Sequence, residues 1–175
     1  MGKFLTTKSV IQQLPIQRQY RTLLNELYMD DDGAIYIVPR NYQTDNFTWI
    51  NATAWDIRCA HLHDVGCQYH KIIKVKLSEW QLNNMGLLKQ GKYDIICLDI
   101  PIDKLEVVEV SKKQINDLFY RMLRDSGAPK HIQILYRTGV ALNVKWYLNK
   151  DELVLEDIYK RKEYTMACKG KKGKK

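Results

Sequence analysis

Two short runs of apolar residues flank a turn in the first quarter of the chain. The segment from Tyr20 to Met29 spaces its leucines in a way that fits either a helix or a strand, and the run from Ala34 to Val38 is apolar and partly β-branched. Between them, Asp30 to Gly33 has the sequence of a turn. The pattern predicts a β-hairpin across this turn, preceded by a polar N-terminal extension over residues 1–19.

The spacing of apolar residues becomes helical from Ala54 to His70. Side chains three and four positions apart lie on one face of a helix. The residues that share this face are Asp56, Cys59, Ala60, His63, Cys67 and His70. We therefore expect a helix here, weakened near its end by Gly66.

Residues 71–110 are typical of β-structure. The segments 71–77 and 105–110 alternate between polar and apolar positions, and the run from Tyr93 to Ile100 is compact and apolar. Alternation with a period of two is the pattern of a half-buried strand. The sequence predicts a β-rich insertion over 71–110.

Two more helices are predicted after this segment. Ser111 is a suitable N-cap for the first, which we expect to end at Gly127, and Pro129 suits the first turn of the second. The apolar stripe of the first helix is Ile115, Leu118, Phe119, Met122 and Leu123. The expected buried side of the second contains Ile132, Leu135, Tyr136, Gly139, Leu142 and Trp146.

These elements together predict an α+β fold: an N-terminal β-hairpin, a His-Asp helix, a β-rich insertion and two further helices packed on one core. A chain of 175 residues with 45% apolar composition is too hydrophobic to be disordered and suits a single globular domain, which we place at residues 20–159. Four cysteines without a secretory context are expected to be reduced. We expect no transmembrane segment and no secretion by a signal peptide.

The net charge of +8 is unevenly distributed. Residues 160–175, called the basic tail below, contain eight basic residues and one acid, so +7 lies there and the rest of the chain carries +1. From Lys169 onward the tail consists only of lysine and glycine. We expect it to be disordered and to make weak, nonspecific contacts with nucleic-acid phosphates, without aromatic side chains to stack on bases.

Reactive side chains are concentrated between residues 59 and 70, which hold three of the four histidines and two of the four cysteines. Within this segment, the imidazole of His63 has the chemistry of a general base, and the adjacent carboxylate of Asp64 suits a hard cation. An alternative is a zinc site made of His63, Cys67 and His70 at positions i, i+4 and i+7. A purely structural alternative is that His63 and Asp64 are a capped or ion-paired pair of residues on a helix, without a role in catalysis.

Two further carboxylates are candidates for the same site. Asp45 precedes the His-Asp helix, and Asp117 lies in the next predicted helix. If both converge on His63 and Asp64, the four residues form a general-base or metal-assisted site, in which Asp64, Asp45 and His63 are candidate ligands of a divalent metal ion. The structural alternatives are a turn or cap for Asp45 and an ion pair with Arg121 for Asp117.

An ordered series of short motifs runs through residues 20–148. In chain order they are Val38-Pro39, Thr44-Asp45, Ala60-x-x-His63-Asp64, Asn116-Asp117 with Phe119, Tyr136-x-x-Gly139 and Trp146. In this order they resemble a family of tailed-phage proteins catalogued as a domain of unknown function. In that family a hairpin ends in Val-Pro, Thr-Asp is followed by Ser-Ile-Pro, and a helix carries Ala-x-x-His-Asp with a tyrosine one turn later. The resemblance implies a diverged phage protein located in the host cytoplasm or associated with the virion.

This chain departs from the family pattern in three places. Residues 46–49 read Asn-Phe-Thr-Trp in place of Ser-Ile-Pro, Cys67 stands where a tyrosine is expected, and the segment 71–110 separates two helices that the family joins more directly. The protein is therefore expected to be a decorated member of the family.

The two helices with the His-Asp pair and the later Asp are also similar to the catalytic helices of calcium-dependent secreted phospholipases. That likeness implies that His63 activates water, Asp64 binds calcium and Asp117 orients His63, although residues 39–53 contain no glycine for a calcium loop. Two functions follow. One is hydrolysis of an ester or phosphodiester, with or without a metal. The other is a non-catalytic phage accessory or virion-associated protein that binds host protein or DNA, with the His-Asp pair as buried scaffolding.

Overall fold

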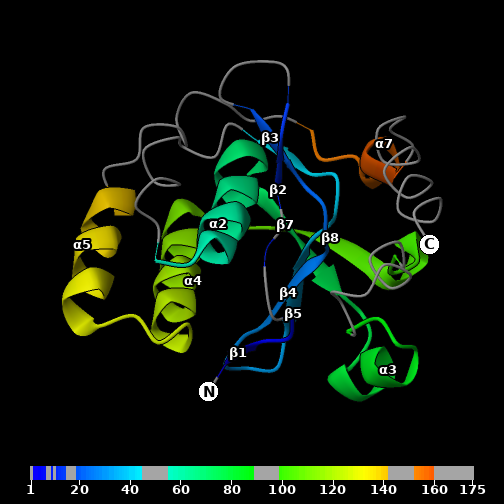
Figure 1. Ribbon diagram of the computed structural model, residues 1–175, viewed down its shortest axis with the longest axis horizontal. Coiled ribbons are helices and arrows are strands. Elements are labelled where there is room, and N and C mark those ends of the chain that lie inside the picture. Colours follow the sequence, from blue (N-terminus) through cyan, green and yellow to red (C-terminus); the bar gives the residue numbers. More distant parts are fainter. Residues whose placement is uncertain are drawn as a thin grey trace.

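The computed structural model has an α+β fold, as the sequence predicts (Figure 1). It describes residues 2–6, 9, 11–14, 19–44, 55–88, 99–141 and 152–159. A five-stranded antiparallel sheet is packed on one side by the longer helices, and a three-stranded sheet lies beside it. Among the described residues, one hydrophobic core joins these elements.

The larger sheet has the strand order β1-β4-β5-β7-β8. Its strands are β1 (Lys3–Phe4), β4 (Glu26–Met29), β5 (Ile35–Val38), β7 (Lys71–Val75) and β8 (Leu105–Glu109). The predicted hairpin is confirmed: β4 pairs with β5, with Leu27 opposite Ile37. Gly33 in the connecting turn has a φ of 86°, a conformation that favours glycine.

The two strands predicted at the ends of the segment 71–110 are part of the main sheet, and the described residues between them contain a short α-helix (Glu79–Asn84) and a 3₁₀-helix (Ile102–Lys104) that the β-rich pattern did not predict. Strand β7 lies between β5 and β8, and Ile73 is buried opposite Ile37. The alternating pattern identified both strands correctly, but only the pairing shows that β7 is central. Most of the predicted apolar run from Tyr93 to Ile100 lies outside the described residues.

The smaller sheet contains β2 (Ile11–Gln13), β3 (Tyr20–Thr22) and β6 (Gln43–Thr44), in the order β2-β3-β6. Residues 1–19, expected to form an extension, therefore contribute β1 to the larger sheet and β2 to the smaller one. Strands of two or three residues are too short to show a periodic pattern in the sequence. They are defined by their backbone hydrogen bonds to partner strands.

The three predicted helices are confirmed close to their expected boundaries, whereas two further α-helices and a 3₁₀-helix among the described residues were not predicted. They are α2 (Ile57–Tyr69), α3 (Glu79–Asn84), the 3₁₀-helix η2 (Ile102–Lys104), α4 (Lys112–Asp125), α5 (Lys130–Ala141) and α7 (Leu155–Tyr159). Ser111 forms a capping box with Gln114, and the whole apolar stripe of α4 is buried. The expected burial of Leu135 on α5 is wrong, because this side chain is 62% exposed. Leu142, Trp146 and the basic tail lie outside the described residues.

Helix α2 packs against β5 and β7 on one side and against α4 on the other, and α5 packs on α4. Gly66 lies at the contact between α2 and α4, where an added Cβ would overlap the side chain of Ile115. This glycine therefore permits close packing of two helices, in addition to its weak helix propensity.

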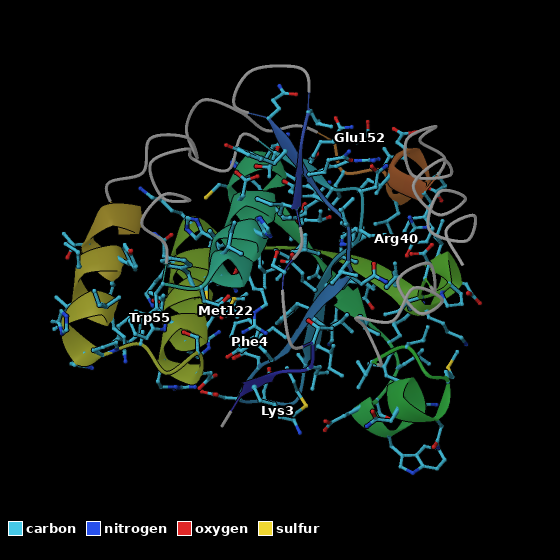
Figure 2. All side chains as sticks on the ribbon, viewed as in Figure 1. Lys3, Phe4, Arg40, Trp55, Met122 and Glu152 are labelled. Atoms are coloured by element: carbon cyan, nitrogen blue, oxygen red, sulfur yellow. The ribbon has the colours of Figure 1, made fainter. Side chains whose placement is uncertain are left out.

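The C-terminal part of the described chain is tied to the sheet by polar contacts. Arg40 lies on the side of the molecule that carries α7 (Figure 2), and its Nε and Nη2 donate to Asp99 at 3.0 and 3.1 Å. The hydroxyl of Tyr159 in α7 donates to the carbonyl oxygen of Ile100 at 2.8 Å. These contacts fix α7 and residues 99–100 on the sheet.

Candidate functional site

Helix α2 lies in the middle of the molecule (Figure 1), and every residue from Cys59 to Cys67 is buried. Its N-terminus is fixed by Asp56, whose side chain accepts a hydrogen bond from the amide of Arg58. The helix ends at Tyr69, and the C-cap residue His70 has a left-handed backbone conformation with φ 55°. The reactive side chains of α2 therefore face other parts of the protein and not solvent.

His63 points towards α4. Its Nε2 lies 2.8 Å from Oδ1 of Asn116, and its ring lies 4.9 Å from the ring of Phe119. Because an amide oxygen only accepts, Nε2 of His63 donates to Asn116 in this contact. The residue as a whole is 2% exposed.

Cys67 lies one turn after His63 on the same helix. Its sulfur is 3.5 Å from Nδ1 of His63 and 3.7 Å from Nε2. A sulfur aligned with the Nδ1 lone pair would lie in the ring plane and much farther from Nε2. The nearly equal distances place the sulfur over the ring face, so the thiol is not aligned to give its proton to Nδ1.

Asp64 points in a different direction, towards β6. Its Oδ2 accepts hydrogen bonds from the Thr44 hydroxyl at 2.5 Å and from the Tyr42 hydroxyl at 3.0 Å, and the residue has no exposed surface. Burial, and then the charge of Asp64, raise the pKa of Tyr42 well above its ordinary value, so this phenol remains a donor. The Thr-Asp and His-Asp motifs therefore meet, through Thr44 and Asp64.

The structure does not assemble the predicted metal sites from the residues it describes. His63 and Asp64 are directed to different elements, as expected for neighbours about 100° apart on a helix. Within the described ranges, no group of three or more His, Cys, Asp or Glu side chains is placed to hold a metal ion. The predicted zinc ligands His63, Cys67 and His70 therefore do not form a metal site in the structure. Asp45 lies outside the described residues.

Asp117 is separate from His63. Its carboxylate accepts from Nζ of Lys113 at 2.8 Å, and the side chain is partly exposed. The expected ion pair with Arg121 is wrong, because Arg121 donates to both carboxylate oxygens of Asp30 at 2.8 and 2.9 Å. The residue of α4 that faces α2 is Asn116, one position earlier, because one step along a helix turns the side chain by about 100°.

A second buried histidine on α2 was missed by the sequence interpretation of this segment. Nδ1 of His61 lies 2.8 and 3.0 Å from the two carboxylate oxygens of Glu26 in β4. Burial lowers the pKa of His61, but the charge of Glu26, its hydrogen bond and the charges of Asp64 and Asp56 together outweigh burial, so the pKa is raised. Among the described residues, Nε2 of His61 has no hydrogen-bond partner. The available signal was Glu26 itself, a charged residue beside the apolar Leu27 and Tyr28.

The remaining expectations concern thiols and membranes. Cys59 and Cys67 are free, buried thiols. In the described part of the chain, no helix has the length and apolar character needed to cross a membrane. Comparison with known proteins finds no matching family model, no matching curated protein and no matching solved structure.

Proposed function

We propose that the protein is a non-catalytic binding protein, a phage accessory or virion-associated protein that binds host protein or DNA, in which the His-Asp pair is buried scaffolding. The observation that carries this proposal is the environment of Asp64. Its carboxylate is fully buried and accepts hydrogen bonds from the hydroxyls of Thr44 and Tyr42. The ordered sequence motifs support the phage origin.

The energetics of burial favour a structural role for this network. An ionised carboxylate without partners is costly to bury, whereas hydrogen bonds to a charged group each contribute roughly 1.5–3 kcal/mol. Thr44 lies in β6 and Tyr42 directly precedes this strand, so Asp64 fixes this edge of the smaller sheet on α2. A satisfied polar network of this kind specifies one arrangement of the core.

Exposed apolar side chains support a binding role. Trp80 on α3 is 73% exposed, and Ile134 and Leu135 on α5 are each more than half exposed. Trp55, which is labelled in Figure 2, is 48% exposed, and its Nε1 lies 3.5 Å from the carbonyl oxygen of Ser126, the C-cap residue of α4. Tryptophan is enriched among the residues that contribute most to the binding energy of protein interfaces.

A second candidate function is hydrolysis with His63 as general base. The hydrogen bond from Nε2 to Asn116 favours it, because this bond fixes the orientation of the imidazole ring. In this mechanism Asn116 is a positioning residue that holds the His63 ring, and Asp64 only stabilises the fold through its hydrogen bonds to Thr44 and Tyr42. The 2% exposure of His63 is the observation against it.

Hydrolysis and metal content distinguish these two functions. The wild-type protein, His63→Ala and the control His131→Ala, which replaces an exposed histidine on α5, are incubated with p-nitrophenyl acetate and bis(p-nitrophenyl) phosphate, with and without Ca²⁺, Mg²⁺ or Zn²⁺. The metal content of each purified protein is also measured. We expect no hydrolysis above buffer and no stoichiometric metal in any of them.

Hydrolysis by the wild type that is lost in His63→Ala and retained in His131→Ala would overturn the proposal in favour of the hydrolase. A stoichiometric metal ion that is lost only in His63→Ala would do the same.

A further inference from the structure

The positive side chains of α4 and α5 differ in how they are partnered. On α4, Lys113, Arg121 and Arg124 each form an ion pair with a carboxylate. On α5, Lys130 and Arg137 have no carboxylate within ion-pair distance among the described residues. Both cations contact the aromatic side chain of one residue of α4 instead.

That residue is Tyr120. Nζ of Lys130 donates to its hydroxyl at 2.7 Å, and the guanidinium carbon of Arg137 lies 4.6 Å from the centre of its ring. Lys130 and Arg137 are seven positions apart, which is two turns, so they project from the same side of α5. Both are exposed, and Tyr120 is half-buried between them.

This arrangement holds two like charges together without an anion. The face of the Tyr120 ring attracts the guanidinium of Arg137, and its hydroxyl oxygen accepts from the ammonium of Lys130, so one residue offsets part of the repulsion between the two cations. The hydrogen bond from Lys130, followed by the charges of Lys130 and Arg137, lowers the pKa of Tyr120. The result is an exposed, positively charged site with a polarised hydroxyl at its centre.

We infer that Tyr120, Lys130 and Arg137 form a binding site for a phosphate group. The ammonium of Lys130 has three donors, of which the phenol uses one, and Arg137 offers a planar fork of donors that matches two phosphate oxygens. The Tyr120 hydroxyl donates its own proton to a third oxygen. Two cations and a hydroxyl suit the charge and the tetrahedral oxygens of phosphate better than the single charge of a carboxylate.

The phosphate has two possible sources, a small molecule or the backbone of a nucleic acid. Within the described part of the chain, Lys130 and Arg137 are exposed on α5, so that part leaves the site open to either source. The site uses none of the reactive residues of α2. The inference rests on the proposed binding function for its biological role, but the chemistry of the site is independent of whether α2 is catalytic.

Two probes and two matched double variants test the inference on the full chain. Inorganic phosphate is titrated and followed by ³¹P NMR, and a short fluorescein-labelled oligothymidylate is followed by fluorescence anisotropy at two salt concentrations. The site variant is Lys130→Gln/Arg137→Gln. The control is Lys76→Gln/Lys104→Gln, which removes the same charge from two exposed lysines near the end of β7. Circular dichroism and urea unfolding establish that each variant is folded.

We expect the site variant to bind phosphate at least about tenfold more weakly than the wild type, because charge-assisted hydrogen bonds are lost, and the control to bind as the wild type does. Tyr120→Phe keeps both cations and is expected to fall between the two. Tighter binding of the oligothymidylate than of phosphate, with a loss in the site variant, identifies a nucleic-acid backbone as the source; a loss for phosphate alone identifies a small molecule.

Wild-type affinity of the site variant for both probes would overturn the inference, as would an equal loss in the control. Neither result would change the hydrolysis and metal measurements on α2, so the two proposals fail separately.

Discussion

Three ionisable side chains of α2 extend towards three different elements. His61 contacts Glu26 of β4, His63 contacts α4, and Asp64 contacts β6. The sequence identified the helix and the His63-Asp64 pair, but the direction of each side chain depends on what packs against α2. For this reason the sequence interpretation selected Asp117 as the partner of His63, whereas the partner in the structure is Asn116, and it missed His61.

The ion pair of His61 and Glu26 makes stability depend on pH. The folded pKa of His61 is raised above its ordinary value of about 6.5, so the stabilisation is fully present below that pH and is lost as the pH rises through the folded pKa. We expect the free energy of unfolding to fall between about pH 6 and pH 8 by more in the wild type than in Glu26→Gln. Urea unfolding at both pH values measures this. An equal fall in the two proteins would show that the pair does not contribute.

Elements with a strong local pattern were predicted, and elements without one were missed: α2, α4, α5 and the strands of the hairpin, β7 and β8 belong to the first group, and α3, α7 and the shortest strands to the second. Local signals such as the Ser111 cap and the apolar stripe of α4 define a helix, and the structure confirms them. The strands β1, β2 and β6 are two or three residues long and exist because of distant partners. The α2–α4 contact is likewise visible only in the structure.

The contact between α2 and α4 depends on Gly66. We expect Gly66→Ala to lower the free energy of unfolding by about 1–3 kcal/mol, because its Cβ would overlap Ile115. Ile115→Ala alone is expected to cost about 2–5 kcal/mol through the cavity it leaves. In the double variant the new methyl group enters that space, so the combined loss is expected to be smaller than the sum. Additive losses in urea unfolding would contradict this packing.

At the scale of the whole molecule, the α+β class followed from the sequence, whereas the position of β7 in the centre of the sheet did not. Composition also separated a nearly neutral body from the basic tail, a division of charge that sequence alone can establish. We expect the charge of the tail to attract nucleic acid without sequence preference, and the proposed phosphate site on α4 and α5 to bind with a defined geometry.

Removal of the last part of the basic tail tests this division. Truncation after Ala167 removes five lysines. We expect weaker retention on DNA at low salt and a shallower dependence of binding on salt, because fewer counterions are released. DNA retention at two salt concentrations measures both. A truncated protein with unchanged retention would assign nonspecific binding to the body.

We expect the hydrogen bonds of Asp64 to Thr44 and Tyr42 to stabilise the fold around the His-Asp helix. The free energy of unfolding of Asp64→Asn measures this stabilisation. Asp117→Asn, which changes a partly exposed carboxylate on α4, is the matched control. Urea unfolding at neutral pH is expected to show a loss of about 2 kcal/mol or more for Asp64→Asn and less than about 0.5 kcal/mol for the control. An unchanged or increased stability of Asp64→Asn would contradict this expectation, because that is the behaviour of a residue retained for chemistry at the expense of stability.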